Sequence, residues 1–177
     1  MDLSVIVVSW NVRDLLRRCL QSILAGSGTA GPLDLEILVV DNASADGSAA
    51  MVRAEFPMVR LIANDENRGF TAANNQGLAA SRGRYLLLLN PDAELVGNAL
   101  AEMVGCLEGH PDAGVVGPQL LYPDGSSQPS RRRFPTLATA LVESTVVQEW
   151  WRDNHILRRY YMLDSPAPAD QPQPVDW

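Results

Sequence analysis

Polar residues follow each of four apolar stretches in the sequence, where they could bind a ligand. They are Ser9, Trp10 and Asn11 after the first stretch, Asp41 and Asn42 after the second, the segment 64–69 after the third, and Asn90, Pro91 and Asp92 after the fourth. In an open parallel sheet, ligands bind beyond the carboxyl ends of the strands. Asn and Asp are also common at strand ends and helix caps for structural reasons, so the pattern predicts where a site lies and leaves each role open.

Asp92 has the most specific chemistry of these residues. Pro91 lacks the N–H that would continue a strand, and it restricts the backbone, so the Asp92 carboxylate should leave the sheet at its open edge. A carboxylate in that place suits a hard divalent cation, which takes oxygen ligands and keeps positions for substrate phosphates. We therefore expect Asp92 to bind a divalent metal.

The apolar stretches alternate with segments of helical periodicity. We predict strands at 3–9, 33–40, 58–64, 84–90 and 113–122, and helices at 11–26, 44–56, 69–83 and 97–111. In the first helix the apolar residues recur three and four positions apart, and Asn11 is its expected cap. Strands and helices that alternate with short connections predict an α/β fold with a mainly parallel sheet flanked by helices.

The character of the sequence changes after Tyr122. The residues that follow are turn-rich and basic, with a predicted helix at 136–151 and a proline-rich segment at 165–174. We therefore predict two parts, an α/β domain at 1–122 and a basic, helical and proline-rich extension at 123–177.

Charge and motifs disfavour several functional classes. The chain of 177 residues has 14 Lys and Arg against 21 Asp and Glu, a net charge of −7, which disfavours nucleic acid as a partner. No GxGxxG motif opens the first helix, and the chain has no GxxxxGK[ST] or GxSxG motif, so dinucleotide-binding dehydrogenases, P-loop enzymes and serine hydrolases are disfavoured. Two separated cysteines, no signal peptide and no long apolar run favour a cytoplasmic protein.

Four segments, in order SVIVVSWN, ILVVDNASADGS, NDENRGFTAANNQG and GRYLLLLNPDAEL, resemble the inverting GT-A glycosyltransferases of family 2. The likeness is to a rhamnosyltransferase-like bacterial branch, which SRRRFPT, RRYYMLD and the terminal VDW also resemble. It covers nearly the whole chain and implies a GT-A fold and a role in cell wall or polysaccharide biosynthesis. Residues 1–122 would then bind the nucleotide-sugar, and 123–177 would begin the acceptor-binding half.

The resemblance also implies roles for individual residues. Val8, Ser9, Trp10, Asn11 and Asp41 would bind the base and ribose, Asn67, Gly69 and Asn74 would lie beside the nucleotide, and Asn90 and Asp92 stand at the family's acidic DxD-like motif. Asp92 would hold Mg²⁺ or Mn²⁺ on the diphosphate, and Asn90 replaces the first acid of the motif. Inversion further needs a general base, which the resemblance places beyond Trp177, so no residue of this chain is assigned that role.

Members of this family transfer a sugar from a nucleotide-diphosphate donor to a glycan or lipid-linked acceptor, with inversion and with help from the metal. We expect this chain to bind the donor weakly and to turn it over poorly or not at all. Two alternatives stay open from the residues alone. One is a sugar nucleotidyltransferase, and the other is a non-catalytic α/β binding module in which Asp41 and Asp92 are caps.

Five arginines in the last third of the sequence stand near aromatic side chains. They are Arg131, Arg132, Arg133, Arg158 and Arg159, close to Phe134, Trp150 and Trp151. A solvated face explains such a set, and contact with an anionic membrane surface also explains it. The second explanation predicts peripheral association with the inner face of the membrane. Apolar surface left uncovered would instead favour a homodimer.

Overall fold

The computed structural model describes residues 1–177 apart from 28–32, 152–153, 164–171, 174 and 176–177. The chain divides into two compact units, Met1–Val116 and Gly117–Trp177. The division into functional domains at 1–122 and 123–177 stays a prediction. Most of the predicted proline-rich segment at 165–174 lies outside the described residues.

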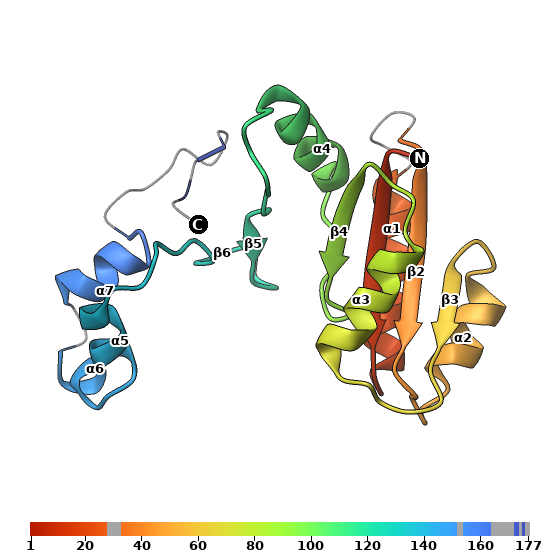
Figure 1. Ribbon diagram of the computed structural model, residues 1–177, viewed down its shortest axis with the longest axis horizontal. Helices are drawn as coiled ribbons and strands as arrows, with labels where there is room; N and C mark the ends of the chain where they lie inside the picture. Colours follow the sequence, from red (N-terminus) through yellow and green to blue (C-terminus); the bar gives the residue numbers. More distant parts are fainter. Residues whose placement is uncertain (28–32, 152–153, 164–171, 174, 176–177) are drawn as a thin grey trace. The chain divides into compact units, whose positions relative to one another are not determined.

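Four parallel strands form the sheet of the first unit. They are β1 (Leu3–Ser9), β2 (Leu35–Asp41), β3 (Arg60–Ala63) and β4 (Tyr85–Leu89), in the spatial order β3-β2-β1-β4 (Figure 1). The predicted α/β class with a parallel sheet is therefore confirmed. The chain adds β2 and β3 on one side of β1 and β4 on the other. The carboxyl ends of β1 and β4 thus border the switch point, where open α/β sheets bind ligands.

Helices cover both faces of this sheet. Side chains of α1 (Arg13–Ser27), α2 (Ser48–Glu55) and α4 (Ala99–Gly109) join the core on one face, and α3 (Phe70–Ala80) packs on β1 and β2 across the other. Successive strand residues point to opposite faces, so Val5 and Val7 meet α1 while Val8 faces α3. Burial on both faces explains why the whole of β1 is apolar or small.

The helix α3 lies close to β1 because Gly77 has no side chain. A Cβ atom at Gly77 would lie 2.4 Å from Cγ2 of Ile6 and 3.5 Å from Cγ2 of Val40. Ile6 is 1% exposed in the middle of the sheet, so it has little room to move away. The close approach of α3 therefore depends on glycine at position 77.

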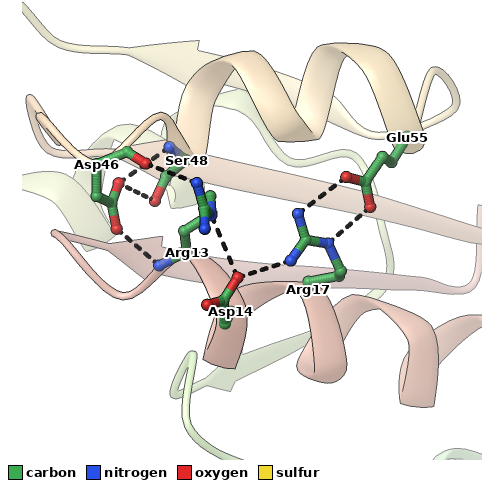
Figure 2. A network of polar contacts seen from close by, with 6 residues as sticks. All are labelled: Arg13, Asp14, Arg17, Asp46, Ser48 and Glu55. Carbon is green, nitrogen blue, oxygen red and sulfur yellow. Dashed lines mark hydrogen bonds and ion pairs between the residues drawn. The ribbon is translucent and has the colours of Figure 1, made fainter.

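Ion pairs and hydrogen bonds tie α1 to α2 (Figure 2). Arg17 donates to Glu55 from Nε at 2.7 Å and from Nη2 at 2.9 Å, and it donates to Asp14 from Nη1 at 2.7 Å. Such a two-point contact between guanidinium and carboxylate fixes direction as well as distance. The two helices are therefore held in register along one edge of their contact.

Asp46 caps the first turn of α1 from the loop before α2. It accepts a hydrogen bond from the backbone N–H of Arg13 at 2.8 Å, and from the N–H and hydroxyl of Ser48 at 3.0 and 2.6 Å. The prediction of Asn11 as the cap is wrong, because the Asn11 side chain instead accepts from the N–H of Ala45. The residue that satisfies the helix end comes from more than 30 positions away.

The described residues of the second unit form short elements. It contains β5 (Leu120–Leu121) and β6 (Ser127–Gln128), which pair antiparallel, and the helices α5 (Leu137–Glu143), α6 (Val147–Trp150) and α7 (His155–Tyr160). Two predictions are wrong here. The stretch 113–122 forms a strand only at its end, because 113–119 have no neighbouring strand among the described residues. The predicted helix at 136–151 is broken where the Thr145 hydroxyl donates to the Leu141 carbonyl, in competition with the backbone.

The described residues contain no helix that is long and apolar enough to span a membrane.

We expect Gly77→Ala to lower the free energy of unfolding by about 1–3 kcal/mol, since the added methyl group must displace Ile6 or shift α3. Gly105→Ala in α4 is the matched control, because a Cβ there meets nothing within 4 Å. The control should gain up to about 1 kcal/mol from helix propensity. Urea denaturation followed by circular dichroism measures both, and a Gly77→Ala protein as stable as wild type would contradict the packing.

Burial by itself would raise the pKa of Asp46, but the hydrogen bonds from Ser48 and from the Arg13 N–H outweigh burial, and the pKa is lowered. Asp46 therefore stabilises the fold above the unfolded-state pKa of about 3.9, and this contribution disappears as the pH falls through the lower folded-state value. We expect Asp46→Asn to cost about 1–2 kcal/mol at pH 7. The difference from wild type should shrink in acid below about pH 4.

The exposed Asp112 supplies the control, since Asp112→Asn makes the same change without a helix end to cap. Thermal or urea unfolding of the three proteins at neutral and acid pH gives the comparison. A loss in Asp46→Asn that is equally large at both pH values would show that the lowered pKa is not its cause.

Candidate functional site

Ser9 and Asp41 lie side by side at the carboxyl ends of β1 and β2. They are partners in the parallel pairing of these strands, and they are 0% and 3% exposed. Asp41 Oδ2 accepts a hydrogen bond from the N–H of Ser44 at 3.1 Å. Asp41 Oδ1 and the Ser9 hydroxyl are buried with no hydrogen-bond partner in the described part of the chain. A buried oxygen without a partner costs roughly 1–3 kcal/mol, so the pair favours a ligand that brings a donor.

The end of β1 is fastened to the loop that follows Asp41. Asn11 has a positive φ of 55°, its N–H donates to the Ser44 hydroxyl at 2.9 Å, and its Oδ1 accepts from the N–H of Ala45 at 2.8 Å. Trp10, the residue before it, is 55% exposed. The Trp10 ring is thus accessible to a ligand, while the backbone that carries it is held in place.

Two other predicted residues have side chains that the fold already uses. Val8 is 9% exposed and packs with Val40 in the core beneath α3. Asn74 is 7% exposed, and its Nδ2 donates to the Phe70 carbonyl of its own helix at 2.9 Å. The Val8 side chain is thus in the core, and one of the two N–H donors of the Asn74 amide is already used within α3.

Asn67 and Gly69 belong to the loop between β3 and α3. Asn67 Oδ1 accepts hydrogen bonds from the Gly69 N–H at 2.9 Å and from Asn42 Nδ2 at 2.7 Å. Gly69 has φ 78° and ψ 164°, a conformation that is essentially restricted to glycine, and it begins α3 without a side-chain cap. Arg68 between them is exposed. Uncapped N–H groups at the start of a helix favour negative charge.

Asn90 and Asp92 follow β4, whose Leu89 pairs with Val7 of β1, so both come next to the end of β1. Their side chains are exposed, whereas the neighbouring Glu94 pairs with Arg18 at 3.0 Å. The backbone carbonyl of Asn90 accepts from the Cys19 thiol, with S and O 3.6 Å apart.

Cys19 is not a reactive group in this site. Burial, with smaller contributions from the charges of Asp92 and Glu94, raises the pKa of the Cys19 thiol to about 12. It therefore stays protonated at neutral pH, and protonated thiols are poor nucleophiles. Its place is structural, beneath the backbone of Asn90.

Asp92 fits a metal site that the substrate completes. No group of three His, Cys, Asp or Glu side chains that could hold a metal ion occurs among the described residues. A cation at Asp92 would take its other ligands from oxygens such as those of Asn90, water and phosphate. The exposed carboxylate is open to such a ligand. Asp92 as a metal ligand stays a prediction.

Three amide residues near this site form a hydrogen-bond network that the sequence did not predict. The sequence indicated Asn42 and Asn64 only as residues that follow strands, and it did not indicate Gln76. Hydrogen bonds join Asn42 to Asn64 at 3.2 Å and Asn64 to Gln76 at 2.8 Å. Asn42 and Asn64 follow β2 and β3 directly, and that position was the available signal. Gln76 carried no signal, because nothing in a helical pattern shows that its partner lies 12 residues away.

The fold is similar to that of proteins of known structure. A mannosyltransferase from Pyrobaculum calidifontis, solved with GDP-Man and Mn²⁺, matches with a TM-score of 0.56 and 29% identity, over 69% of this chain and 36% of that one. The crystal structure of S. aureus TarS 1–349 matches with a TM-score of 0.55, over 82% of this chain and 45% of that one. At 19% identity the second likeness concerns the fold alone. The predicted GT-A fold is confirmed.

The sequence is also similar to that of proteins named for polysaccharide biosynthesis and sugar transfer. The succinoglycan biosynthesis protein ExoO of Rhizobium meliloti is 38% identical over 104 residues, which are 58% of this chain and 29% of that protein. The N-acetylglucosaminyl-diphospho-decaprenol L-rhamnosyltransferase of Mycobacterium tuberculosis is 26% identical over 169 residues, 89% of this chain and 54% of that protein. The chain thus spans about half or less of the length of these relatives.

The family itself follows from a match along most of the sequence. The sequence model described as glycosyl transferase family 2 matches residues 4–166. This range includes both the sheet edge described above and most of the second unit. On this evidence the chain belongs to glycosyl transferase family 2, as its motifs predicted.

Proposed function

We propose that this chain binds the nucleotide-sugar donor of an inverting, metal-assisted glycosyltransferase. The observation that carries the proposal is the buried Asp41 Oδ1, which lacks a partner beside the Ser9 hydroxyl. A carboxylate oxygen can only accept, and we propose that it accepts from a protonated ring nitrogen of the nucleobase. Uracil, thymine and guanine have one at their pairing edge, whereas adenine and cytosine offer only an exocyclic amino group there. UDP, dTDP and GDP are therefore the candidate nucleotides.

The diphosphate would lie near the amino end of α3. The helix begins at Gly69 without a side-chain cap, and the exposed Arg68 precedes it. Free N–H groups and a nearby guanidinium both favour phosphate oxygens. These groups would allow a chain with a net charge of −7 to hold an anion.

Asp92 would hold Mg²⁺ or Mn²⁺ on the diphosphate, with Asn90 beside it. When bound, such a cation stabilises the negative charge of the departing nucleoside diphosphate as a Lewis acid. Asp92 supplies one carboxylate, since Glu94 is paired with Arg18. A weak metal site that needs the substrate's own oxygens follows from this arrangement.

We assign the role of general base to no described residue of this chain. Two carboxylates near the sheet edge are already engaged, because Asp46 caps α1 and Glu94 pairs with Arg18. Asp41 is buried beside β1, and in this proposal it faces the nucleobase of the donor. With no base assigned, we expect this chain to bind donor with little or no turnover.

The acceptor would be a glycan or a lipid-linked sugar reached at the membrane surface. The mycobacterial relative is named for a diphospho-decaprenol acceptor. In the second unit, the N–H of Arg133 donates to the Tyr160 carbonyl at 3.0 Å, and Arg132 lies 4.3 Å from the centre of the Tyr161 ring. These contacts bring the arginine runs at 131–133 and 158–159 together.

An apolar row begins beside these arginines. Phe134, Leu137 and Leu141 are 67%, 92% and 64% exposed, and the two leucines are four residues apart on one side of α5. Arginines next to exposed apolar side chains suit an anionic lipid surface, where each charge contributes about 1 kcal/mol. Peripheral contact with the inner membrane face is therefore part of the proposal.

Calorimetric titration of the protein with nucleoside diphosphates and Mn²⁺ tests donor binding. We expect UDP, dTDP or GDP to bind about tenfold more tightly than CDP and ADP, the order of one hydrogen bond. Asp41→Asn should remove most of this preference, since an amide N–H₂ can replace the accepting oxygen. Asp92→Ala should leave binding without metal unchanged and remove the gain that Mn²⁺ brings.

Asp112→Asn, exposed and outside the site, is the matched control and should behave as wild type. If wild type binds none of the five nucleotides, the donor-binding proposal fails, and a non-catalytic α/β module becomes the better explanation. If Asp92→Ala keeps the whole effect of Mn²⁺, the metal is bound elsewhere.

Co-sedimentation with lipid vesicles tests the membrane contact. The protein should bind phosphatidylglycerol-containing vesicles and not phosphatidylcholine alone. Arg131→Glu and Leu137→Gln should each weaken binding by roughly fivefold or more. Arg53→Glu and Val115→Gln make the same changes at exposed positions of the first unit.

If Arg53→Glu and Val115→Gln weaken vesicle binding as much as Arg131→Glu and Leu137→Gln do, the result would contradict a defined membrane surface on the second unit. Size-exclusion chromatography of the same variants gives the second readout. If Leu137→Gln alters only the oligomeric state, the apolar row is a homodimer contact and the membrane proposal fails.

A further inference from the structure

We propose that Asn42 is a positioning residue for the donor diphosphate, an inference that rests on the proposed function. Its carboxamide holds the loop 64–69 against the end of β2. The amino end of α3 and the backbone of Arg68 thereby keep a fixed position relative to Asp41, the residue that precedes Asn42. The base and the diphosphate of one ligand would be coupled through Asn42.

Both ends of the Asn42 carboxamide are used, although the residue is only 2% exposed. Its Nδ2 donates to Asn67 Oδ1 at 2.7 Å and to the Gly69 carbonyl at 3.4 Å. Its Oδ1 accepts from the backbone N–H of Arg68 at 3.0 Å and from Asn64 Nδ2 at 3.2 Å. One side chain therefore contacts the loop at its beginning and along its last three residues.

The contact with Arg68 decides which way the amide points. A backbone N–H can only donate, so the Asn42 atom that faces Arg68 must be the oxygen. The nitrogen then faces Asn67 Oδ1 and the Gly69 carbonyl, which can only accept. Aspartate has no donor for those two oxygens at neutral pH, and serine or alanine is too short to reach both sides. The geometry therefore favours asparagine over these three residues.

Further hydrogen bonds link this loop to α3 and link Asn42 to β1. Asn64 and Gln76 exchange two hydrogen bonds, at 2.8 and 3.0 Å, which link the start of the loop to the helix body. The backbone N–H of Asn42 donates to the Ser9 carbonyl at 2.8 Å, so β1 and β2 stay paired past Asp41. The Ser9–Asp41 pair and the loop are thus parts of one rigid arrangement.

Asn42→Asp is the test variant, and Asn75→Asp is its control. The control makes the same isosteric change and adds the same charge on an exposed position of α3. We would measure Kd for the tightest of UDP, dTDP and GDP with Mn²⁺, and for the matching nucleoside, by ¹H–¹⁵N NMR titration. The Kd of the nucleoside divided by the Kd of the diphosphate gives the contribution of the diphosphate to binding, because the nucleobase and ribose are common to both ligands.

We expect Asn42→Asp to reduce this ratio by roughly tenfold while nucleoside binding changes by less than about twofold. Asn75→Asp should leave the ratio near that of wild type. If circular dichroism shows that Asn42→Asp is unfolded, Asn67→Ala decides the question. It removes the acceptor that Asn42 Nδ2 and the Gly69 N–H share, from an exposed position, and should reduce the ratio in the same way.

An unchanged ratio in the folded variant would overturn the proposal. So would an equal loss for the nucleoside and the diphosphate, because that result indicates general damage to the sheet edge. A wild-type protein that binds neither ligand would instead refute the proposed donor site. The two failures are therefore distinguishable.

Discussion

The parallel pairing of β1 with β2 and β4 is the constraint on which the candidate site depends. It places Ser9 opposite Asp41 and brings the residues after Leu89 next to the end of β1. A shift of one residue would turn Ser9 toward the opposite face of the sheet and break the pair. At the other end of the strands, the Ser4 hydroxyl donates to Glu36, its register partner, at 2.6 Å. Apolar cores on both faces and this polar pair hold the register.

The polar groups at the carboxyl ends of the strands are of two kinds. The amides of Asn42, Asn64 and Gln76 satisfy one another, and the Asp46 carboxylate is used by Arg13 and Ser48. Within the described residues of the first unit, the buried side-chain atoms left without a partner are Ser9 Oγ and Asp41 Oδ1. Hydrogen-bonded groups make the scaffold rigid, whereas buried groups without a partner can bind a ligand, so this contrast separates the scaffold from the proposed ligand-binding surface.

Membership of glycosyl transferase family 2 gives this contrast a chemical meaning. A transferase must hold a flexible, highly charged donor so that the base, diphosphate and sugar keep one geometry. The proposed base-binding oxygen and the loop before α3 are joined through Asn42 and the end of β2. Asp92 stands apart from that network, exposed after the end of β4. A metal bound there would depend on the donor for its remaining ligands.

Much of the fold could be predicted because its signals are local. The strand at 3–9 was predicted with its observed bounds, and the other three strands of the sheet differ from prediction by one or two residues at each end. The strand predicted at 113–122 was wrong over most of its length, because an apolar run becomes a strand only where a neighbouring strand pairs with it. The prediction of Asn11 as the cap of α1 was also wrong, since Asp46 caps this helix from another loop.

By itself, the sequence determined the α/β class, the family motifs and the positions along the chain where ligand-binding residues are expected. Those features follow from the period of apolar residues and from residue type, which need no knowledge of distant partners. Only the tertiary structure decided that Asp41 Oδ1 is unpartnered and that Asn42 holds the loop at 67–69. Hydrogen-bond satisfaction depends on groups that are 25 or more residues apart in the chain and meet only in the folded protein.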